Sequence, residues 1–336
     1  MPPEPRANPE LIGHDDAART LAEAAESGRL HHAWLIAGPP GLGKATLAYR
    51  FARWLLAGRP AAPGRTPLFL AESDPVFQRV AAGAHADLLS LAPNLGERGK
   101  KEVLRAEDAR AVRRFLSLTA AEGGWRVVVI EGLEQSERGI VQNILLKTLE
   151  EPPPRTVQVI VTDAADALLP TIRSRCRRID LHPLAEDAMR QLLDDWLPDM
   201  PATKRAGLAR IADGAPGLAL TLAAGEGLEM QALVERLLAA LPNLAARQAL
   251  EIAEATTARR DAAALVTFFA LLRRAIAASL RAAARGGPPA AWLGARSLSD
   301  GAVLWERLGR LADETERLNL DRKQAVLTAF GLLADG

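Results

Sequence analysis

A glycine-rich stretch near the amino end has the residue types and spacing that bind phosphate. Residues 38–44 read Gly-Pro-Pro-Gly-Leu-Gly-Lys, the G-x-x-x-x-G-K pattern of a phosphate-binding loop, or P-loop. In this pattern the backbone N–H groups around Gly38, Gly41 and Gly43, with those of the following helix, surround phosphate oxygens. Lys44 would reach the β and γ oxygens of a nucleotide. The chemistry indicated is binding of ATP or ADP.

The residue after the lysine is Ala45, where the pattern expects a Ser or Thr hydroxyl that holds Mg²⁺. Thr46 lies about 100° further round the helix, so its hydroxyl does not simply replace the missing one. Two readings stay open: the loop binds ATP or ADP without a proper metal site, or it is a glycine-rich turn that binds nothing. The candidate nucleotide-binding residues are Gly38, Gly41, Gly43, Lys44, Ala45 and Thr46.

The elements beside this loop are the ones that would position it. An apolar strand is predicted at 33–37, and a helix follows the loop, with Leu47, Phe51, Trp54 and Leu55 on one face. Strands separated by helical segments predict a parallel α/β sheet. The other predicted segments are a helix containing residues 18–25, strands at 87–91, 126–130 and 157–161, a polar surface loop at 94–101 and a helix at 107–118.

A second nucleotide motif should be an apolar strand that ends in acidic residues, Asp for the Mg²⁺ shell and Glu to activate water. The strand at 126–130 ends in Glu131 and Gly132, with Glu134 further along, on a predicted loop. Taken alone, this pattern also fits a buried strand followed by an exposed acid. Together with Ala45, the departures at Glu131 and Gly132 argue against efficient hydrolysis, because phosphoryl transfer depends on positioning and charge stabilisation.

Composition bounds the class of protein. The chain has 336 residues, 49% of them hydrophobic, and a formal net charge of +1, so any nucleic-acid contact must be a local patch. Its one cysteine, Cys176, excludes an internal disulfide framework and a multi-cysteine zinc site. The proline-rich start at 1–9 does not resemble a signal peptide, and no run of about 18 apolar residues is present. We therefore expect a cytoplasmic protein.

Strand patterns fade after Pro183. Short helical segments follow, interrupted by the turn at 214–217, and residues 228–336 are rich in Ala, Leu and Arg and predict helices throughout. The main break is the Gly-Gly-Pro-Pro sequence at 286–289, expected to be a solvent-exposed loop between helices.

Two longer motifs make a resemblance specific. Residues 143–153 read N-I-L-L-K-T-L-E-E-P-P, and residues 169–176 read L-P-T-I-R-S-R-C. Together they resemble the N-x-L-L-K-x-L-E-E-P-P and S-R-C motifs of bacterial clamp-loader AAA+ subunits. The segments at 11–14 and 31–33 resemble the opening of that family, and residues 318–324 resemble its collar domain.

The resemblance implies an architecture and a setting. The α/β P-loop (AAA+) core with its parallel sheet would span 1–183, a small helical lid domain 184–226, and an all-α collar domain 227–336. The chain would be a non-motor subunit of the replicative clamp loader, within a DNA polymerase III holoenzyme, which as a whole is a DNA-directed DNA polymerase and nucleotidyltransferase. Implied partners are the motor (gamma/tau) and delta subunits and, through them, the sliding clamp and primer–template DNA; no membrane is implied.

The resemblance also assigns roles to residues. Arg175, in the S-R-C motif, would be an arginine finger that acts in trans at the ATP site of a neighbouring motor subunit. The residues alone favour another reading, in which Arg175 is one member of a solvated basic cluster with Arg173, Arg177 and Arg178; the surrounding motif reverses that preference. Motor subunits of the family carry four zinc-binding cysteines, and residues 57–90 have none, so no zinc is expected and His85 is read as structural. Gly217 stands where a motor subunit has an arginine for the γ-phosphate, while Thr162 occupies the expected sensor-1 position.

Two other functions stay open. An active AAA+ ATPase, such as a motor subunit, would need Mg²⁺ held through water or Thr46 and a base from Glu131 or Glu134. An AAA+ adaptor would bind nucleotide for structure alone. Hydrolysis by the purified chain that Lys44→Ala abolishes would favour the first, and titration with ATP and ADP bears on the second.

Overall fold

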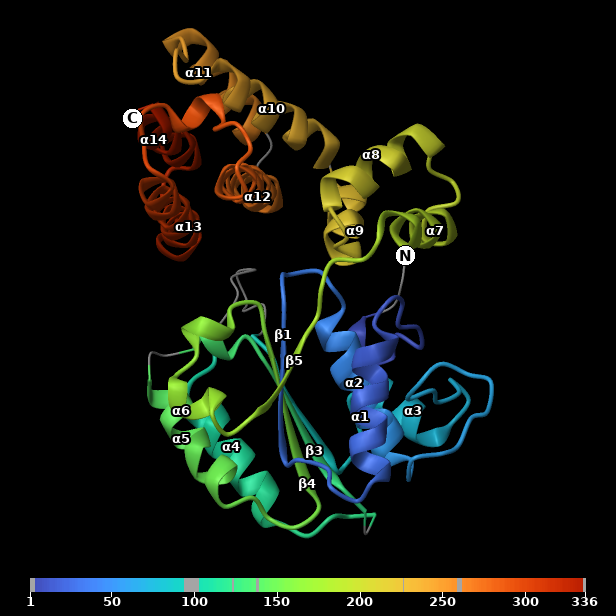
Figure 1. Ribbon diagram of the computed structural model, residues 1–336. Coiled ribbons are helices and arrows are strands. Elements are labelled where there is room, and N and C mark those ends of the chain that lie inside the picture. The colour runs from blue at the N-terminus through green and yellow to red at the C-terminus, as the bar shows by residue number, and fades with distance from the viewer. Residues whose placement is uncertain are drawn as a thin grey trace. The chain divides into compact units, whose positions relative to one another are not determined.

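The computed structural model describes residues 4–93, 103–122, 124–136, 139–225, 227–258 and 262–334, and the side chains within them except those of 262, 263 and 317. The predicted polar loop at 94–101 lies outside these residues. The chain divides into two compact units, residues 1–219 and 220–336, and each is described by itself (Figure 1).

The first unit is built on a parallel sheet with the strand order β2-β3-β4-β1-β5. The strands are β1 (Ala33–Ala37), β2 (Leu88–Leu91), β3 (Arg126–Glu131), β4 (Thr156–Thr162) and β5 (Arg177–Asp180). The first four confirm the strands predicted from apolar runs. Strand β5 was not predicted, because it lies at the edge beside β1 and only Ile179 of its residues is buried. The sheet confirms the predicted α/β P-loop core.

Helices cover both faces of this sheet (Figure 1). Side chains alternate along β1: Trp34 and Ile36 join the core under α1 and α2, whereas Leu35 joins the core under α4 and α5. The covering helices are α1 (Asp15–Glu26) and α2 (Lys44–Leu56) on one face and α4 (Ala106–Ser117) and α5 (Ile140–Glu150) on the other. The same part of the chain also contains α3 (Pro75–Ala81), α6 (Pro170–Arg173), α7 (Glu186–Trp196) and α8 (Ala202–Ala212). Short 3₁₀ turns are η1 (Pro5–Ala7), η2 (Leu133–Gln135) and η3 (Ala165–Ala167).

The helix that follows the P-loop is buried on almost every side, including at two arginines. Arg53 of α2 donates hydrogen bonds of 2.6 Å to the backbone carbonyls of Arg6 and Asn8. Burial lowers the pKa of its guanidinium to about 10, with Arg50 nearby adding repulsion. Arg50 itself donates to the carbonyl of Pro67 at 3.1 Å. These contacts fasten α2, and with it the P-loop, to the amino-terminal segment.

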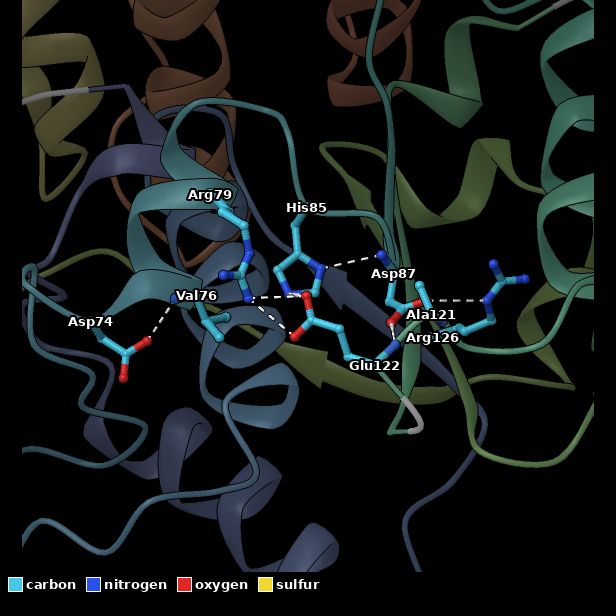
Figure 2. A network of polar contacts seen from close by, with 8 residues as sticks. All are labelled: Asp74, Val76, Arg79, His85, Asp87, Ala121, Glu122 and Arg126. Carbon is cyan, nitrogen blue, oxygen red and sulfur yellow. Dashed lines mark hydrogen bonds and ion pairs between the residues drawn. The ribbon is translucent and has the colours of Figure 1, made fainter.

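A polar network fastens the amino ends of β2 and β3, at the edge of the sheet away from the P-loop (Figure 2). Asp87 accepts hydrogen bonds from the backbone N–H groups of Ala121 (2.8 Å) and Glu122 (3.0 Å) and pairs with Arg126 at 3.5 Å. Burial alone would raise the pKa of Asp87, but these partners outweigh it and lower that pKa. His85 accepts from the N–H of Asp87 at 3.2 Å and is buried, which agrees with its structural reading.

The second unit is helical, as predicted. Helix α9 (Pro216–Ala224) crosses the boundary between the units, and α10 (Gly227–Ala240), α11 (Ala246–Thr257), α12 (Ala262–Ala284), α13 (Leu298–Leu318) and α14 (Arg322–Ala334) follow it, with a 3₁₀ turn, η4 (Ala291–Leu293). In its core, the Phe268 ring packs edge to face against the rings of Phe269 and Phe330. The predicted break at 286–289 separates α12 from η4. The division into a lid at 184–226 and a collar from 227 remains a prediction.

Candidate functional site

The P-loop runs from the end of β1 to the start of α2, at the carboxyl edge of the parallel sheet. Gly38, Gly41 and Gly43 have positive φ angles of 149°, 81° and 86°, which side-chain-bearing residues rarely adopt. The helix begins at Lys44, so its first backbone N–H groups follow the loop directly. The backbone conformation therefore suits an anion.

The P-loop lysine is already engaged within the chain. The Nζ atom of Lys44 lies 2.6 Å from a carboxylate oxygen of Asp163 and donates to the carbonyl oxygen of Pro39, also at 2.6 Å. The Lys44 side chain is only 4% exposed, whereas that of Asp163 is 45% exposed. A phosphate approaching this lysine would have to displace the carboxylate, which already supplies its counter-charge.

Both candidate acids after β3 are engaged as well. Glu131 accepts a hydrogen bond of 3.2 Å from the Tyr49 hydroxyl on α2, and burial followed by the Glu131 charge raises the pKa of Tyr49 to about 12. Glu134 lies in η2 and accepts from the Thr162 hydroxyl at 2.9 Å and from the N–H of Asp163 at 3.3 Å. The structure thus links Glu134, Thr162, Asp163 and Lys44 in one polar chain.

The turn before α9 lies directly against the P-loop. The N–H of Gly217 donates to the carbonyl of Gly41 at 2.8 Å. A Cβ atom built at Gly217 would lie 2.9 Å from the Cα of Gly41, too close for any side chain unless the backbone moves. Gly217, where the resemblance implied the sensor-2 position, therefore permits a backbone contact that any side chain there would disturb.

The first turn of α2 offers little to a metal ion. Ala45 is half-buried and packs against the core between the sheet and helices α1 and α2, and the Thr46 residue is only 8% exposed. Among the described residues, no group of three or more His, Cys, Asp or Glu side chains could hold a metal ion.

Arg175 lies apart from these residues, on the turn after α6. One terminal nitrogen of its guanidinium donates to the carbonyl of Thr171 at 3.0 Å, and the other lies 2.7 Å from a carboxylate oxygen of Glu150 on α5. The side chain is 34% exposed. Burial raises the pKa of the neighbouring Cys176 thiol to about 12, so this cysteine is not a ready nucleophile.

The other arginines of the predicted basic cluster have separate partners. Arg173 pairs with Asp166 at 2.6 Å, Arg178 pairs with Asp180 at 2.8 Å, and Arg177 lies over the Trp34 ring, 5.1 Å from its centre. Each of these arginines thus has its own partner, and Arg177 and Arg178 are exposed to solvent.

Comparison with known proteins identifies the family. Residues 13–185, more than half of the chain, match the family described as DNA polymerase III, delta subunit. The chain belongs to the DNA polymerase III delta subunit family. This agrees with the resemblance to clamp-loader subunits carried by residues 143–153 and 169–176.

Individual relatives lie in the same group. The chain is 36% identical to DNA polymerase III subunit delta' of Pseudomonas aeruginosa over 60% of its own length and 58% of that protein. It is 35% identical to subunit delta' of Escherichia coli K12, covering 61% of this chain and 58% of that protein. The matches thus span less than two thirds of these relatives. Subunit tau of Salmonella typhimurium is 29% identical over 75% of this chain and 38% of its own.

Among solved structures, a gamma subunit-related protein from Thermotoga maritima is 19% identical, with a TM-score of 0.46 and coverage of 95% of this chain and 98% of that one.

Three residues of this delta-family site escaped the sequence reasoning. Asp163 follows Thr162 at the carboxyl end of β4, and that position alone could have indicated its proximity to the P-loop, because parallel strands end at the same edge. Glu150 stood inside a recognised motif but received no role. Tyr49 gave no signal, because in sequence it is one more residue of an apolar helix.

Proposed function

We propose that this chain is a non-motor, stator-like subunit of the bacterial replicative clamp loader. It completes a ring with ATP-hydrolysing neighbours and supplies Arg175 to one of them, so that the sliding clamp is loaded on primed DNA. The observation that carries the proposal is a contrast within the chain: Lys44 is neutralised by Asp163, while Arg175 is held at the surface, one third exposed.

The chain's own P-loop site is poorly equipped for hydrolysis. Ala45 offers no hydroxyl to Mg²⁺, and Glu131 and Glu134 already accept hydrogen bonds from Tyr49 and Thr162. The loop backbone still fits a phosphate, so ATP or ADP would bind through Gly38, Gly41, Gly43 and Lys44 only after displacing Asp163. We propose that such binding is weak and is not followed by turnover. The proposal includes no zinc.

Arg175 suits action in trans because its guanidinium is permanently charged and planar. Such a fork matches the oxygens of a γ-phosphate, and an arginine finger is worth roughly 10³–10⁵ in rate. The proposed partners are the gamma/tau motor subunits and a delta subunit and, through them, the sliding clamp and primer–template DNA. A role in replication would take place in the cytoplasm, which is the location we propose. In the described residues, no helix has both the length and the apolar character needed to cross a membrane.

The test is DNA-stimulated ATP hydrolysis and clamp loading by the reconstituted complex. Arg175→Ala should leave folding and assembly intact and sharply lower both rates. Arg173→Ala is the matched control, because Arg173 lies two residues away and pairs with Asp166 instead. Equal rates for the two variants would contradict the assignment.

The alternative of an active ATPase has its own test. The purified chain, free of other subunits, is assayed for ATP hydrolysis beside Lys44→Ala. The proposal expects both to show only background; turnover that the substitution abolishes would favour a motor subunit.

A further inference from the structure

The contact between Glu150 and Arg175 joins two elements that are separate in sequence. We infer that Glu150 is the positioning residue for Arg175, fixing the guanidinium in the orientation in which it meets a neighbour's phosphate. This inference rests on the proposed role of Arg175 in trans.

The two contacts of Arg175 define the plane of its guanidinium. Glu150 holds one terminal nitrogen at 2.7 Å, and the Thr171 carbonyl holds the other at 3.0 Å. A guanidinium has five N–H donors in a fixed fork. Within the described part of the chain these contacts use two of them, one on each terminal nitrogen. The remaining donors can engage a phosphate while Glu150 keeps its hold.

Glu150 stands at a rigid point. It is the last residue of α5, and the carbonyl of the preceding Leu149 accepts a hydrogen bond of 2.9 Å from His32. Two residues back, the Thr148 hydroxyl donates to the side-chain oxygen of Gln158 on β4 at 3.1 Å. On the other side, Ile172 of α6 is fully buried. Both ends of the ion pair are thus mounted on the packed core, as a preorganised site requires.

Helix stability does not explain a glutamate at this position. The carboxyl end of a helix carries a partial negative charge, which disfavours a carboxylate there. Glu151 follows as a second acid, exposed to solvent. Arg175 supplies the cation that offsets the unfavourable charge at Glu150. The ion pair with Arg175, rather than the stability of α5, therefore accounts for a glutamate at position 150.

The experiment substitutes Glu150→Gln, which keeps the shape of the side chain and removes its charge. Glu151→Gln is the matched control: the same change, one residue away, on an exposed acid. Each variant full chain is reconstituted with the other clamp-loader subunits, and DNA-stimulated hydrolysis is measured against ATP concentration. For a partly exposed ion pair we expect kcat to fall roughly three- to fivefold with KM unchanged. The control should match the parent chain.

A double substitution separates positioning from a structural effect. In an Arg175→Ala background, Glu150→Gln should lower the rate no further, because its only role is through Arg175. The inference is overturned if Glu150→Gln behaves like Glu151→Gln, or if it costs the same factor with Arg175 absent. If Arg175→Ala itself has no effect, the proposed function fails instead.

Discussion

Gly217 and Gly41 meet backbone to backbone, with the N–H of Gly217 donating to the carbonyl of Gly41 at 2.8 Å. Each glycine leaves room for the other: a Cβ at Gly41 would lie 2.9 Å from the nitrogen of Leu218, and a Cβ at Gly217 would lie 2.9 Å from the Cα of Gly41. The start of α9 and the P-loop are thereby held together by backbone atoms, which, unlike side chains, cannot relieve a clash by changing rotamer.

The first prediction concerns this contact. Gly217→Ala should destabilise the protein by about 1–3 kcal/mol, because the added methyl group must push apart two backbone segments. In an unobstructed helix the same change stabilises by up to about 1 kcal/mol. Thermal or urea unfolding measures the difference. Gly331→Ala in α14 is the matched control, since a Cβ there meets nothing within 4 Å; the two variants should shift stability in opposite directions. A stabilised Gly217→Ala chain would show that the contact yields easily.

The second prediction concerns the counter-charge of the P-loop. Asp163→Asn removes the carboxylate 2.6 Å from Lys44 and leaves a buried ammonium without its anion. Phosphate oxygens can then take that place, so the variant should bind ATP and ADP at least about tenfold more tightly than the parent chain. Calorimetric titration of the isolated chain measures the affinity.

Asp166→Asn provides the control for that titration, because Asp166 pairs with Arg173 and its side chain is 92% exposed. Its nucleotide affinity should equal that of the parent chain. Unaltered affinity in Asp163→Asn would mean that the carboxylate does not compete for the lysine.

The third prediction concerns the pH dependence of the protein's stability. Burial lowers the pKa values of His14 and His85 below 6.5, outweighing the contacts that raise them. Each group is then neutral in the fold but gains a proton in the unfolded chain as the pH falls through 6.5, so the unfolded state binds more protons there. The free energy of unfolding should therefore decrease from pH 7 to pH 5.

His14→Gln tests one contribution to that slope. A glutamine can still donate to the Leu42 carbonyl that His14 contacts at 2.8 Å, yet it does not titrate. Urea unfolding at the two pH values should show a weaker pH dependence for the variant. The idea is refuted by an identical slope in both chains.

The fourth prediction concerns the network of Figure 2. Asp87→Asn replaces a buried acceptor of two backbone hydrogen bonds and the partner of Arg126, so it should lower stability at neutral pH by about 1–3 kcal/mol. Because the pKa of Asp87 is lowered in the fold, its contribution is present above its unfolded pKa and is lost as the pH falls through the folded value. Asp16→Asn, at a side chain that is 96% exposed, should change stability by less than about 0.5 kcal/mol. Similar losses in both variants would contradict this account.

Sequence patterns predicted the elements that carry strong apolar runs. Strands β1, β3 and β4 are buried almost throughout, so runs of mostly apolar residues mark them, with Gln158 as a polar residue inside β4. Strand β5 carries Arg177, Arg178 and Asp180 around a single buried Ile179, and an edge strand of this kind leaves no periodic signal.

Only the part of the candidate site that lies within a single sequence motif could be predicted. The P-loop glycines and Lys44 follow a fixed local spacing, and their backbone conformation agrees with it. The contacts around the P-loop follow no such spacing. Asp163 meets Lys44, and Glu131 meets Tyr49, only because the folded sheet brings distant segments together. Contacts of that kind are set by tertiary packing, which spacing along the chain does not encode.

The ion pair between Lys44 and Asp163 has a consequence for the cell as well as for the pocket. Because Asp163 is part of the chain, its carboxylate lies beside Lys44 at any concentration of ATP or ADP. Under the proposed function, this chain would therefore respond little to the adenylate supply. In the proposed assembly, whose other members cycle between nucleotide states, this chain would be a subunit that does not respond to nucleotide.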